Sequence, residues 1–312
     1  ESAPRVAVPC QACGTTTPSD AFDKFGFQYQ QCGACASLYV SPRPTAGELD
    51  LYYRESPAIR FWRERVLPAT ADARAQKIAL PRAQWVADGL AEHCADAELA
   101  LDLSPAGSTL GQELLGVRPG ASANRSYDLA SLGVGGASRV VVHQDEHPGA
   151  VDVVTAFDVL DRTFDVRALV QSIRARLKPG GVLFATATSI SGFDLQVLWE
   201  RSTTLTPPDK LQALSIAGFR TLFAEPDWEL IELSTPGMLD SENVRRSVRT
   251  DPNASWPRLI RTLAANLDER GWTSLQEFLQ EHRQAPLLLR RRGEFLPLPQ
   301  WRGDDVIGPH FL

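Results

Sequence analysis

The chain has 312 residues, of which 43% are hydrophobic and 22% charged, a composition typical of a folded globular protein. Its 32 Lys and Arg against 38 Asp and Glu give a formal net charge of −6, which argues against a nucleic-acid-binding surface. No apolar run approaches the roughly 20 residues of a membrane span and nothing resembles a signal peptide, so we expect a cytoplasmic protein of about two domains.

Four of the five cysteines form two C-x2-C pairs near the N-terminus, namely Cys10, Cys13, Cys32 and Cys35. Two such turns supply the four thiolates of a tetrahedral zinc site. Gly14 directly follows Cys13 and Gly33 directly follows Cys32, at positions where a tight turn needs a conformationally permissive residue. The alternative is two disulfides in a secreted protein, which the spacing and the chain length disfavour. Because four cysteines close the coordination sphere, we predict a structural zinc ion in a ribbon over residues 1–44.

Residues 45–97 are predicted to form helices that connect the ribbon to the rest of the chain. Thr45 stands three residues before Glu48, the pattern of a helix N-cap. Alanine and charged residues at helical spacing follow, with interruptions at Pro68 and Pro81. The fifth cysteine, Cys94 at the end of this segment, is best interpreted as a small buried apolar side chain.

Short apolar runs alternate with helical patterns over residues 98–292. Strands are predicted at residues 99–103, 140–143, 151–157, 182–187 and 228–233, a helix at 166–177 and a turn at 178–181. Strands that alternate with helices indicate an α/β fold with a mainly parallel, doubly wound sheet. Residues 293–312, with Pro297, Pro299 and Pro309, are predicted to be an irregular tail.

Residues 151–194 carry a D-V-V strand, a V-L-D-R loop and an L-K-P-G-G turn in this order. This segment resembles the class I S-adenosylmethionine-dependent methyltransferases, and motifs at residues 41–44, 77–82, 207–211 and 228–240 resemble a subgroup that has an N-terminal zinc ribbon. The resemblance covers nearly the whole chain. It implies a Rossmann-like, doubly wound sheet of the seven-stranded methyltransferase type. It also implies that strands 228–233 and 286–291 pair antiparallel at one edge.

The resemblance further implies that S-adenosylmethionine lies across the carboxyl ends of the first strands. The acid that ends the family's first strand is here Asp102, whereas the three glycines of its G-x-G-x-G loop align with serine and alanine. We place the second strand at residues 116–117, so the family's ribose-binding acid aligns with Arg118, which cannot accept a hydrogen bond, and Asp128 or a water would have to replace it. The candidate cofactor-binding residues are Asp102, Ser104, Ala106, Ser108, Arg118, Asp145, Phe157 and Asp158.

The catalytic residues stay unassigned, because Asp161-Arg162 stand where the family often has Glu-His and the chain lacks a general base with a pKa near 7 there. One function is methyl transfer to a small molecule such as a sugar or a natural-product intermediate. A second is a catalytically inactive methyltransferase-like protein, a pseudoenzyme, that binds a partner protein. A third is an enzyme that uses the old cofactor crevice for another ligand. No nucleic acid and no membrane are expected as partners, and the sequence does not indicate the oligomeric state.

Overall fold

The computed structural model describes residues 4–97, 99–103, 122–126, 151–224, 228–233, 240–281 and 287–291. The strand expected at residues 140–143 and the expected tail lie outside this part of the chain, as do most of the residues around the expected cofactor loop. No helix in the described ranges is long and apolar enough to cross a membrane.

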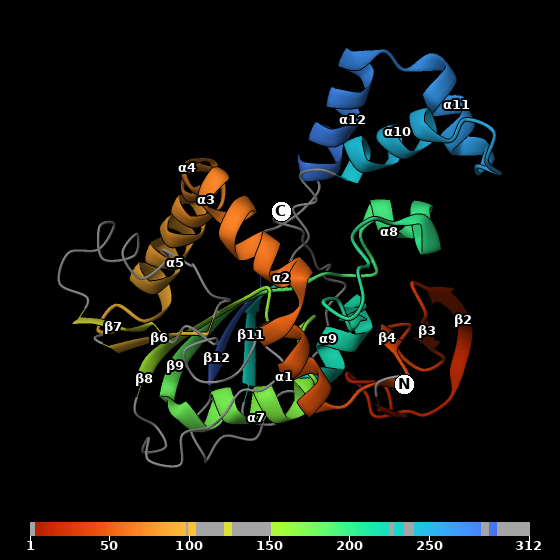
Figure 1. The fold of residues 1–312 in the computed structure, drawn as a ribbon. Helices are drawn as coiled ribbons and strands as arrows, with labels where there is room; N and C mark the ends of the chain where they lie inside the picture. Colours follow the sequence, from red (N-terminus) through yellow and green to blue (C-terminus); the bar gives the residue numbers. More distant parts are fainter. Residues whose placement is uncertain are drawn as a thin grey trace.

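The N-terminal region contains two small antiparallel sheets. Strands β1 (Arg5–Val6) and β5 (Arg43–Pro44) form one of them. Strands β2 (Pro18–Lys24), β3 (Phe27–Cys32) and β4 (Leu38–Val40) form the other, in which β3 is central. A fourth strand, β10 (Gln212–Ala213), pairs with β4 although it lies far along the chain (Figure 1). The sheet of the ribbon is therefore completed by the α/β region.

A chain of helices follows the ribbon: α1 (Ala46–Glu55), α2 (Pro57–Phe61), η1 (Trp62–Val66), α3 (Leu67–Ala69), α4 (Ala71–Arg74), η2 (Ala75–Ala79) and α5 (Leu80–His93). The N-cap prediction is confirmed, because the backbone N–H of Glu48 donates to Oγ1 of Thr45 at 3.3 Å. Pro68 and Pro81 stand in the first turns of α3 and α5, where a missing N–H leaves no hydrogen bond unmade.

Within the described ranges, the central sheet contains six strands: β6 (Leu99–Asp102), β7 (Ser122–Ser126), β8 (Val151–Phe157), β9 (Leu177–Thr186), β11 (Trp228–Glu232) and β12 (Leu287–Arg291). Their order is β11-β12-β9-β8-β6-β7. Strands β7, β6, β8 and β9 are parallel, whereas β12 is antiparallel to both β9 and β11. The expected antiparallel pair at one edge is confirmed.

The second strand differs from the prediction. The strand parallel to β6 is residues 122–126, with Asp102 opposite Ser126, rather than residues 116–117. Strand β7 reads S-A-N-R-S and carries no apolar run that would mark it in the sequence. A strand that pairs through its backbone does not need an apolar sequence, so the pattern misplaced it.

Helices cover both faces of the sheet, as a doubly wound arrangement requires (Figure 1). On one face, α5 contributes Val86 and Leu90 to an apolar cluster that contains Val153 and Phe184. On the other face, α7 (Val166–Arg176) and α9 (Ile216–Leu222) pack with the alternate residues of β8 and β9. Cys94 is partly buried beside the α5 cluster, which agrees with its interpretation as a small apolar side chain.

The connection between α7 and β9 is tighter than expected. The Asp165 side chain caps α7 by accepting from the backbone N–H of Ala168 at 2.9 Å. Strand β9 begins at Leu177, so the turn predicted at residues 178–181 lies within the strand. Of the two glycines in this segment, only Gly180 has a positive φ, of 82°. The other, Gly181, is required for a different reason, because a Cβ there would lie 2.8 Å from a backbone oxygen of β8.

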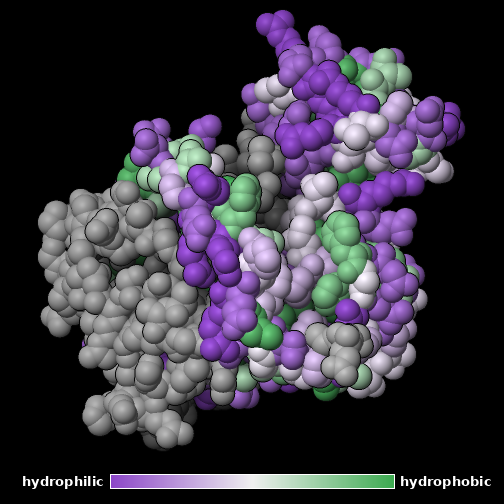
Figure 2. Space-filling model, viewed as in Figure 1, coloured by the Kyte–Doolittle hydropathy of each residue, from purple (hydrophilic) through white to green (hydrophobic). Residues whose placement is uncertain are grey.

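A helical insertion between β11 and β12 was not predicted. It consists of α10 (Asp240–Thr250), α11 (Arg258–Asn266) and α12 (Glu269–Glu281), and it packs with α8 (Phe193–Leu198) around Trp256 and Trp272. In Figure 2 the face of the insertion that is in view is mostly hydrophilic, and hydrophobic groups on this side of the molecule are separated rather than joined in one patch.

Candidate functional site

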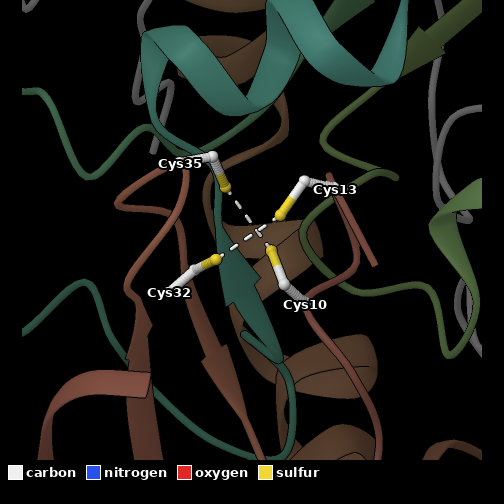
Figure 3. A group of neighbouring side chains, drawn as sticks. All are labelled: Cys10, Cys13, Cys32 and Cys35. Atoms are coloured by element: carbon white, nitrogen blue, oxygen red, sulfur yellow. Dashed lines mark hydrogen bonds between the residues drawn. The ribbon is translucent and has the colours of Figure 1, made fainter. Parts of the chain in front are cut away.

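The four cysteines of the ribbon converge on one point, and their sulfur atoms all lie within 4.8 Å of one another (Figure 3). Two of the sulfur–sulfur distances are 3.5 Å, from Cys10 to Cys35, and 3.4 Å, from Cys13 to Cys32. Ligands at about 2.3 Å around a tetrahedral zinc ion lie roughly 3.8 Å apart, whereas the sulfurs of a disulfide lie about 2.05 Å apart. The cysteines are free thiols, so the disulfide alternative is wrong and the cluster suggests a zinc site.

Each C-x2-C turn closes on the carbonyl of its first cysteine. The N–H of Gly14 donates to Cys10 at 2.8 Å, and the N–H of Ala36 donates to Cys32 at 2.9 Å. Gly14 and Ala36 both have positive φ, of 77° and 57°. The left-handed residue of the second turn is therefore Ala36 and not Gly33, whose added Cβ would instead come within 3.1 Å of a backbone oxygen.

The thiols of the cluster differ in acidity. The hydrogen bond from Cys10 lowers the pKa of Cys35 to about 5, although burial opposes this shift. The same contact, followed by burial, raises the pKa of Cys10. One thiol of the group thus ionises readily, and binding of a metal to all four would release the remaining protons.

The ribbon is joined to the α/β region through a buried arginine. Arg43 is fully buried, and its guanidinium donates to the carbonyl of Phe164 at 2.9 Å and to Oε1 of Gln212 at 3.1 Å. Burial lowers the pKa of Arg43 to about 10, so this side chain stays charged at neutral pH. Because a buried cation without these partners would cost several kcal/mol, the ribbon and the loop before α7 are held in one arrangement.

A second contact between the ribbon and the α/β region lies at the second C-x2-C turn, where the start of α9 packs against it. The hydroxyl of Ser215 donates to the carbonyl of Cys35, and its backbone N–H donates to Oγ of Ser37 at 3.0 Å. A Cβ on Gly218 would lie 2.0 Å from Oγ of Ser37. Buried ribbon residues, including Cys10 and Cys32, belong to the same apolar cluster as α7 and β9. The ribbon and the α/β region therefore share one continuous core.

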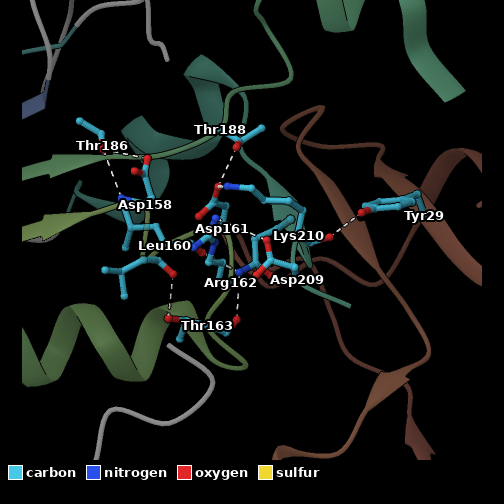
Figure 4. A network of polar contacts seen from close by, with 12 residues as sticks. Tyr29, Asp158, Leu160, Asp161, Arg162, Thr163, Thr186, Thr188, Asp209 and Lys210 are labelled. Carbon is cyan, nitrogen blue, oxygen red and sulfur yellow. Dashed lines mark hydrogen bonds and ion pairs between the residues drawn. The ribbon is translucent and has the colours of Figure 1, made fainter. Parts of the chain in front are cut away.

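The carboxyl edge of β8 and β9 carries a network of charged side chains (Figure 4). Asp158 follows β8 with a φ of 58°, and its Oδ2 accepts from Nη2 of Arg82, in α5, at 2.7 Å. Its Oδ1 accepts from the hydroxyl of Thr186, at the end of β9, at 3.1 Å. Burial tends to raise the pKa of Asp158, but Arg82 and the further cations nearby outweigh it and hold this pKa below its usual value. Asp158 is therefore a carboxylate at neutral pH.

Asp161 is the most deeply buried acid of the network, with 1% of its surface exposed. Its Oδ2 accepts from the Thr188 hydroxyl at 2.6 Å and forms an ion pair with the Lys210 ammonium group (Figure 4). Its Oδ1 has no hydrogen-bond partner within the described residues. This oxygen therefore remains able to accept from a donor outside the described part of the chain.

Arg162 and two tyrosines of α1 complete the network. Nη2 of Arg162 lies 3.4 Å from Oδ2 of Asp209, and Oδ1 of Asp209 accepts from the Tyr53 hydroxyl at 3.1 Å. Burial tends to lower the pKa of Arg162, but the carboxylates around it raise it. Burial, together with Asp209, raises the pKa of Tyr53 and raises that of Tyr52 to about 12. Both hydroxyls consequently stay protonated.

Only part of the predicted cofactor site falls in the described residues. The backbone of Asp102 ends β6, beside β7 and β8. Ser104, Ala106, Ser108, Arg118 and Asp145 lie outside the described residues. Phe157 has 1% of its surface exposed, and its ring packs against Trp85 and Arg82, which leaves little surface for an adenosine. Asp158 lies at the edge, as expected for a residue that follows β8.

Sequence reasoning gave no role to Arg82, Asp209, Lys210 or the two tyrosines of α1. The motifs at residues 77–82 and 207–211 were recognised as family features, and this was the signal that was available. Their pairing with residues 158–162 depends on segments that are 47 to 76 residues apart, so no local spacing revealed it.

Residues 82–233 match a protein family described as a methyltransferase domain. The match begins in α5 and ends just after β11, so it includes Arg82 and the loops that carry Asp158 to Arg162 and Asp209 to Lys210, and it excludes the tyrosines of α1 and the cysteine cluster. Over these residues the chain is similar to a methyltransferase domain, and its fold is mixed α/β. A search of curated protein sequences finds no match.

Several solved structures are similar in general fold. One is a protein from Galdieria sulphuraria titled as a sarcosine dimethylglycine methyltransferase, with 15% identity and a TM-score of 0.40, covering 70% of this chain and 88% of that one. Another is the plantazolicin methyltransferase BpumL in complex with SAH, with 11% identity and a TM-score of 0.40, covering 80% and 95%. A third is the 4+2 cyclase SpnF, with 17% identity and a TM-score of 0.35, covering 66% and 80%.

Proposed function

We propose that the chain is an S-adenosylmethionine-dependent methyltransferase that acts on a small molecule. The observation that carries this proposal is the order of the strands: parallel β7, β6, β8 and β9 within the matched segment, with the antiparallel β12, from beyond that segment, beside β9. Ligands of open α/β sheets bind at the carboxyl ends of the parallel strands, where Asp102 ends β6 and Asp158 follows β8. When bound there, the cofactor supplies an electrophilic methyl group, and the protein has to place the acceptor in line with it.

The position of β7 changes which residue we propose for the ribose. The family resemblance implies an acid shortly after the second strand, and β7 ends at Ser126. In the sequence Asp128 follows two residues later, whereas Arg118 precedes the strand. We therefore assign the ribose hydroxyls to Asp128 and no contact to Arg118. A carboxylate at this point is compatible with hydroxyl donors, and an arginine is not.

Calorimetry of the zinc-loaded protein with S-adenosylhomocysteine tests this proposal. Loss of a hydrogen bond to a charged group costs about 1.5–3 kcal/mol, so Asp128→Asn is expected to weaken binding by one to two decades. Arg118→Gln serves as the matched control and should leave the affinity unchanged. Equal affinities of the Asp128→Asn variant and the wild type would contradict the assignment of Asp128, and absence of binding by the wild type would contradict the proposed function.

A second candidate function, a catalytically inactive binding protein, is favoured by one specific observation. The glycine positions of the family loop are Ser104, Ala106 and Ser108 in this chain. A left-handed conformation at such a residue costs about 1 kcal/mol or more without glycine. The double variant Ser104→Gly/Ala106→Gly distinguishes the two functions: a gain of binding from an undetectable level supports the inactive protein, whereas measurable binding by the wild type supports the enzyme.

For the cysteine cluster we propose a structural zinc ion. All four ligands come from the chain, so the metal would have no open position for a substrate or a water. The contacts at Arg43 and Gly218 support a structural role, because they hold the cysteine cluster against the folded core. Elemental analysis for one zinc per chain tests the proposal.

A further inference from the structure

The helical insertion after β11 contains a cavity of about 450 Å³. Its lining residues belong to α10, α11, α12 and the turns that join these helices (Figure 1). Small-molecule sites in proteins usually have volumes of roughly 300–1,000 Å³, so the cavity is large enough for a small ligand. The segment that is similar to a methyltransferase domain ends at residue 233, and this likeness therefore assigns no role to the cavity.

Two tryptophans form the floor of the cavity. Trp256 and Trp272 line it although only 5% and 4% of their surfaces are exposed. The Trp256 ring is held from behind, because its indole N–H donates to the carbonyl of Asp251 at 2.8 Å and the Arg201 guanidinium lies 5.2 Å from its centroid. The other apolar residues of the lining are Val248, Pro252, Ala264, Ala265 and Leu267. The cavity thus offers a ligand an apolar surface that is already in place.

One ion pair crosses the lining, which contains five charged residues. These residues are Arg245, Arg249, Arg261, Asp268 and Glu269. Arg245 donates from Nη1 to Oε1 of Glu269 at 2.8 Å and from Nη2 to Oε2, and it also lies 3.4 Å from Glu242 outside the lining. The hydrogen bond from Arg245, with a smaller effect of Arg249, holds the pKa of Glu269 below its usual value. Arg245 and Glu269 therefore satisfy each other.

The remaining charges of the lining do not pair. Arg249 and Arg261 are exposed at the rim, and neither forms an ion pair within the part of the chain that the structure describes. Asp268 forms none there either, and its Oδ1 accepts from the N–H of Gly271 at the start of α12, at 2.8 Å. Two positive charges thus stand against one negative charge, which favours a ligand that carries a single negative charge.

We propose that this cavity binds a small apolar molecule that carries one carboxylate. The apolar part would lie on the tryptophan floor, and the carboxylate would accept hydrogen bonds from Arg249 and Arg261, since guanidinium groups present paired donors to carboxylates. A phosphate monoester carries about −1.5 to −2 at neutral pH, which exceeds the positive charge left over at the rim. The proposal is independent of the proposed methyl transfer, because it uses no residue of the sheet edge.

Titration of the full-length, zinc-loaded protein with 4-phenylbutyrate tests the site, by calorimetry and by tryptophan fluorescence. The wild type is expected to bind one molecule per chain and to change its fluorescence, because two tryptophans line the cavity. Two further probes separate the two halves of the ligand: 4-phenylbutanamide lacks the charge, and acetate lacks the ring. Each should bind at least tenfold more weakly than 4-phenylbutyrate.

Substitutions at the rim identify the site. Arg249→Gln and Arg261→Gln should each weaken binding of 4-phenylbutyrate at least threefold, a modest effect because both arginines are exposed. Arg246→Gln and Arg258→Gln, at exposed arginines of α10 and α11 outside the lining, are the matched controls and should change nothing. Asp268→Asn keeps a side chain that can cap α12 and removes a repulsive charge, so it should strengthen binding about twofold.

Four results would overturn the proposal. The wild type does not bind 4-phenylbutyrate; or both rim variants bind it as the wild type does; or saturating S-adenosylhomocysteine prevents its binding, which would place the probe in the cofactor crevice; or its affinity falls as the protein concentration rises, which would assign the cavity to a second copy of the chain. If S-adenosylhomocysteine fails to bind while 4-phenylbutyrate binds in an Arg249-dependent way, the proposed function fails and this site stands.

Discussion

The cysteine cluster and the charged edge differ in how completely their groups satisfy one another. The cluster gathers four equivalent sulfur ligands that come from two short turns, and a tetrahedral metal would use all of them. The edge gathers side chains from α1, α5 and several loops, and Oδ1 of Asp161 and Nε of Arg162 have no hydrogen-bond partner among the described residues. A site whose groups all bind one another stabilises a fold, whereas a site with unused polar atoms can still bind another group.

The two regions are nevertheless connected. The hydroxyl of Tyr29, in β3 of the ribbon, donates to the backbone carbonyl of Lys210, whose side chain pairs with Asp161 (Figure 4). Strand β10 follows directly and pairs with β4. The ribbon thus holds in place the loop that carries Asp209 and Lys210. We therefore expect that substitutions in the ribbon also destabilise the charged edge. The substitutions below are ordered from the largest expected loss of stability to the smallest.

The largest effect is expected from loss of the metal. Cys32→Ser should abolish zinc binding, which in structural sites contributes on the order of 10 kcal/mol, and the whole described fold should lose stability because the core is continuous. Elemental analysis and thermal unfolding followed by near-UV circular dichroism measure this. Cys94→Ser is the control and should retain the metal. If the α/β region of Cys32→Ser still unfolds in a separate transition at the wild-type temperature, the prediction that the two regions are coupled is wrong.

At the edge, Asp158→Asn removes the charge that faces Arg82 while an asparagine still tolerates the positive φ. We expect a loss of about 3 kcal/mol at pH 7 in urea-induced unfolding, because Arg82 keeps its charge in a mostly buried place. Since the pKa of Asp158 is lowered by folding, its contribution is present above about pH 4 and is lost as the pH falls through its pKa in the folded state.

The wild type and the Asp158→Asn variant should therefore converge in stability below about pH 4. The control is Glu229→Gln, which breaks the more exposed pair with Arg290 and should cost less than about 1 kcal/mol. A difference between wild type and Asp158→Asn that is the same at pH 3 and pH 7 would contradict the ionic explanation.

The contact between α9 and the zinc turns is tested by Gly218→Ala. The new methyl group would overlap Oγ of Ser37, so we expect a loss of about 2 kcal/mol in chemical unfolding and weaker retention of zinc against a chelator. Gly47→Ala, in α1, is the control, because a Cβ there meets nothing within 4 Å. That variant should be neutral or more stable by up to about 1 kcal/mol. If the two variants are equally stable, α9 can move away from Ser37 at little cost in free energy.

The smallest effect is expected at Tyr29. Tyr29→Phe removes the hydrogen bond to Lys210 and should cost about 1 kcal/mol in the free energy of unfolding. Tyr39→Phe is the matched control, since Tyr39 is equally buried and its hydroxyl makes no hydrogen bond within the described ranges. If only Tyr29→Phe also weakens binding of S-adenosylhomocysteine, the ribbon supports the charged edge; if both variants bind it equally, the contact affects stability only.

The elements that were predicted well are those with local signals. The cysteine cluster follows from ligand spacing, β8 from one continuous apolar run, and α7 from its helical pattern and from Pro179 after it. The insertion after β11 was missed, although Ile260 and Leu263 in α11, and Trp272 and Leu275 in α12, have helical spacing. Their apolar sets are short and are interrupted by charged residues, so no single run marks them.

The charged edge was not predictable in the same way. Arg82, Asp158 and Lys210 become neighbours only because α5 and the loop before β10 are brought to the same end of the sheet. Charged residues are usually solvated, so their types alone give no reason to pair them. The glycine roles show the same limit: Ala36 adopts the conformation expected of Gly33, because the turn is set by the metal ligands and their hydrogen bonds.

The place of β12 in the sheet has a consequence for how the protein is made. This strand pairs with β9 on one side and β11 on the other, yet 54 residues of insertion and connection lie between β11 and β12 in the sequence. During synthesis from the N-terminus, the hydrogen-bonding edges of β9 and β11 stay unpaired until residue 287 has left the ribosome. Three amphipathic helices emerge in that interval. While these 54 residues are being synthesised, the nascent chain therefore exposes two unpaired strand edges at the same time. A chaperone would be able to bind these edges during that interval.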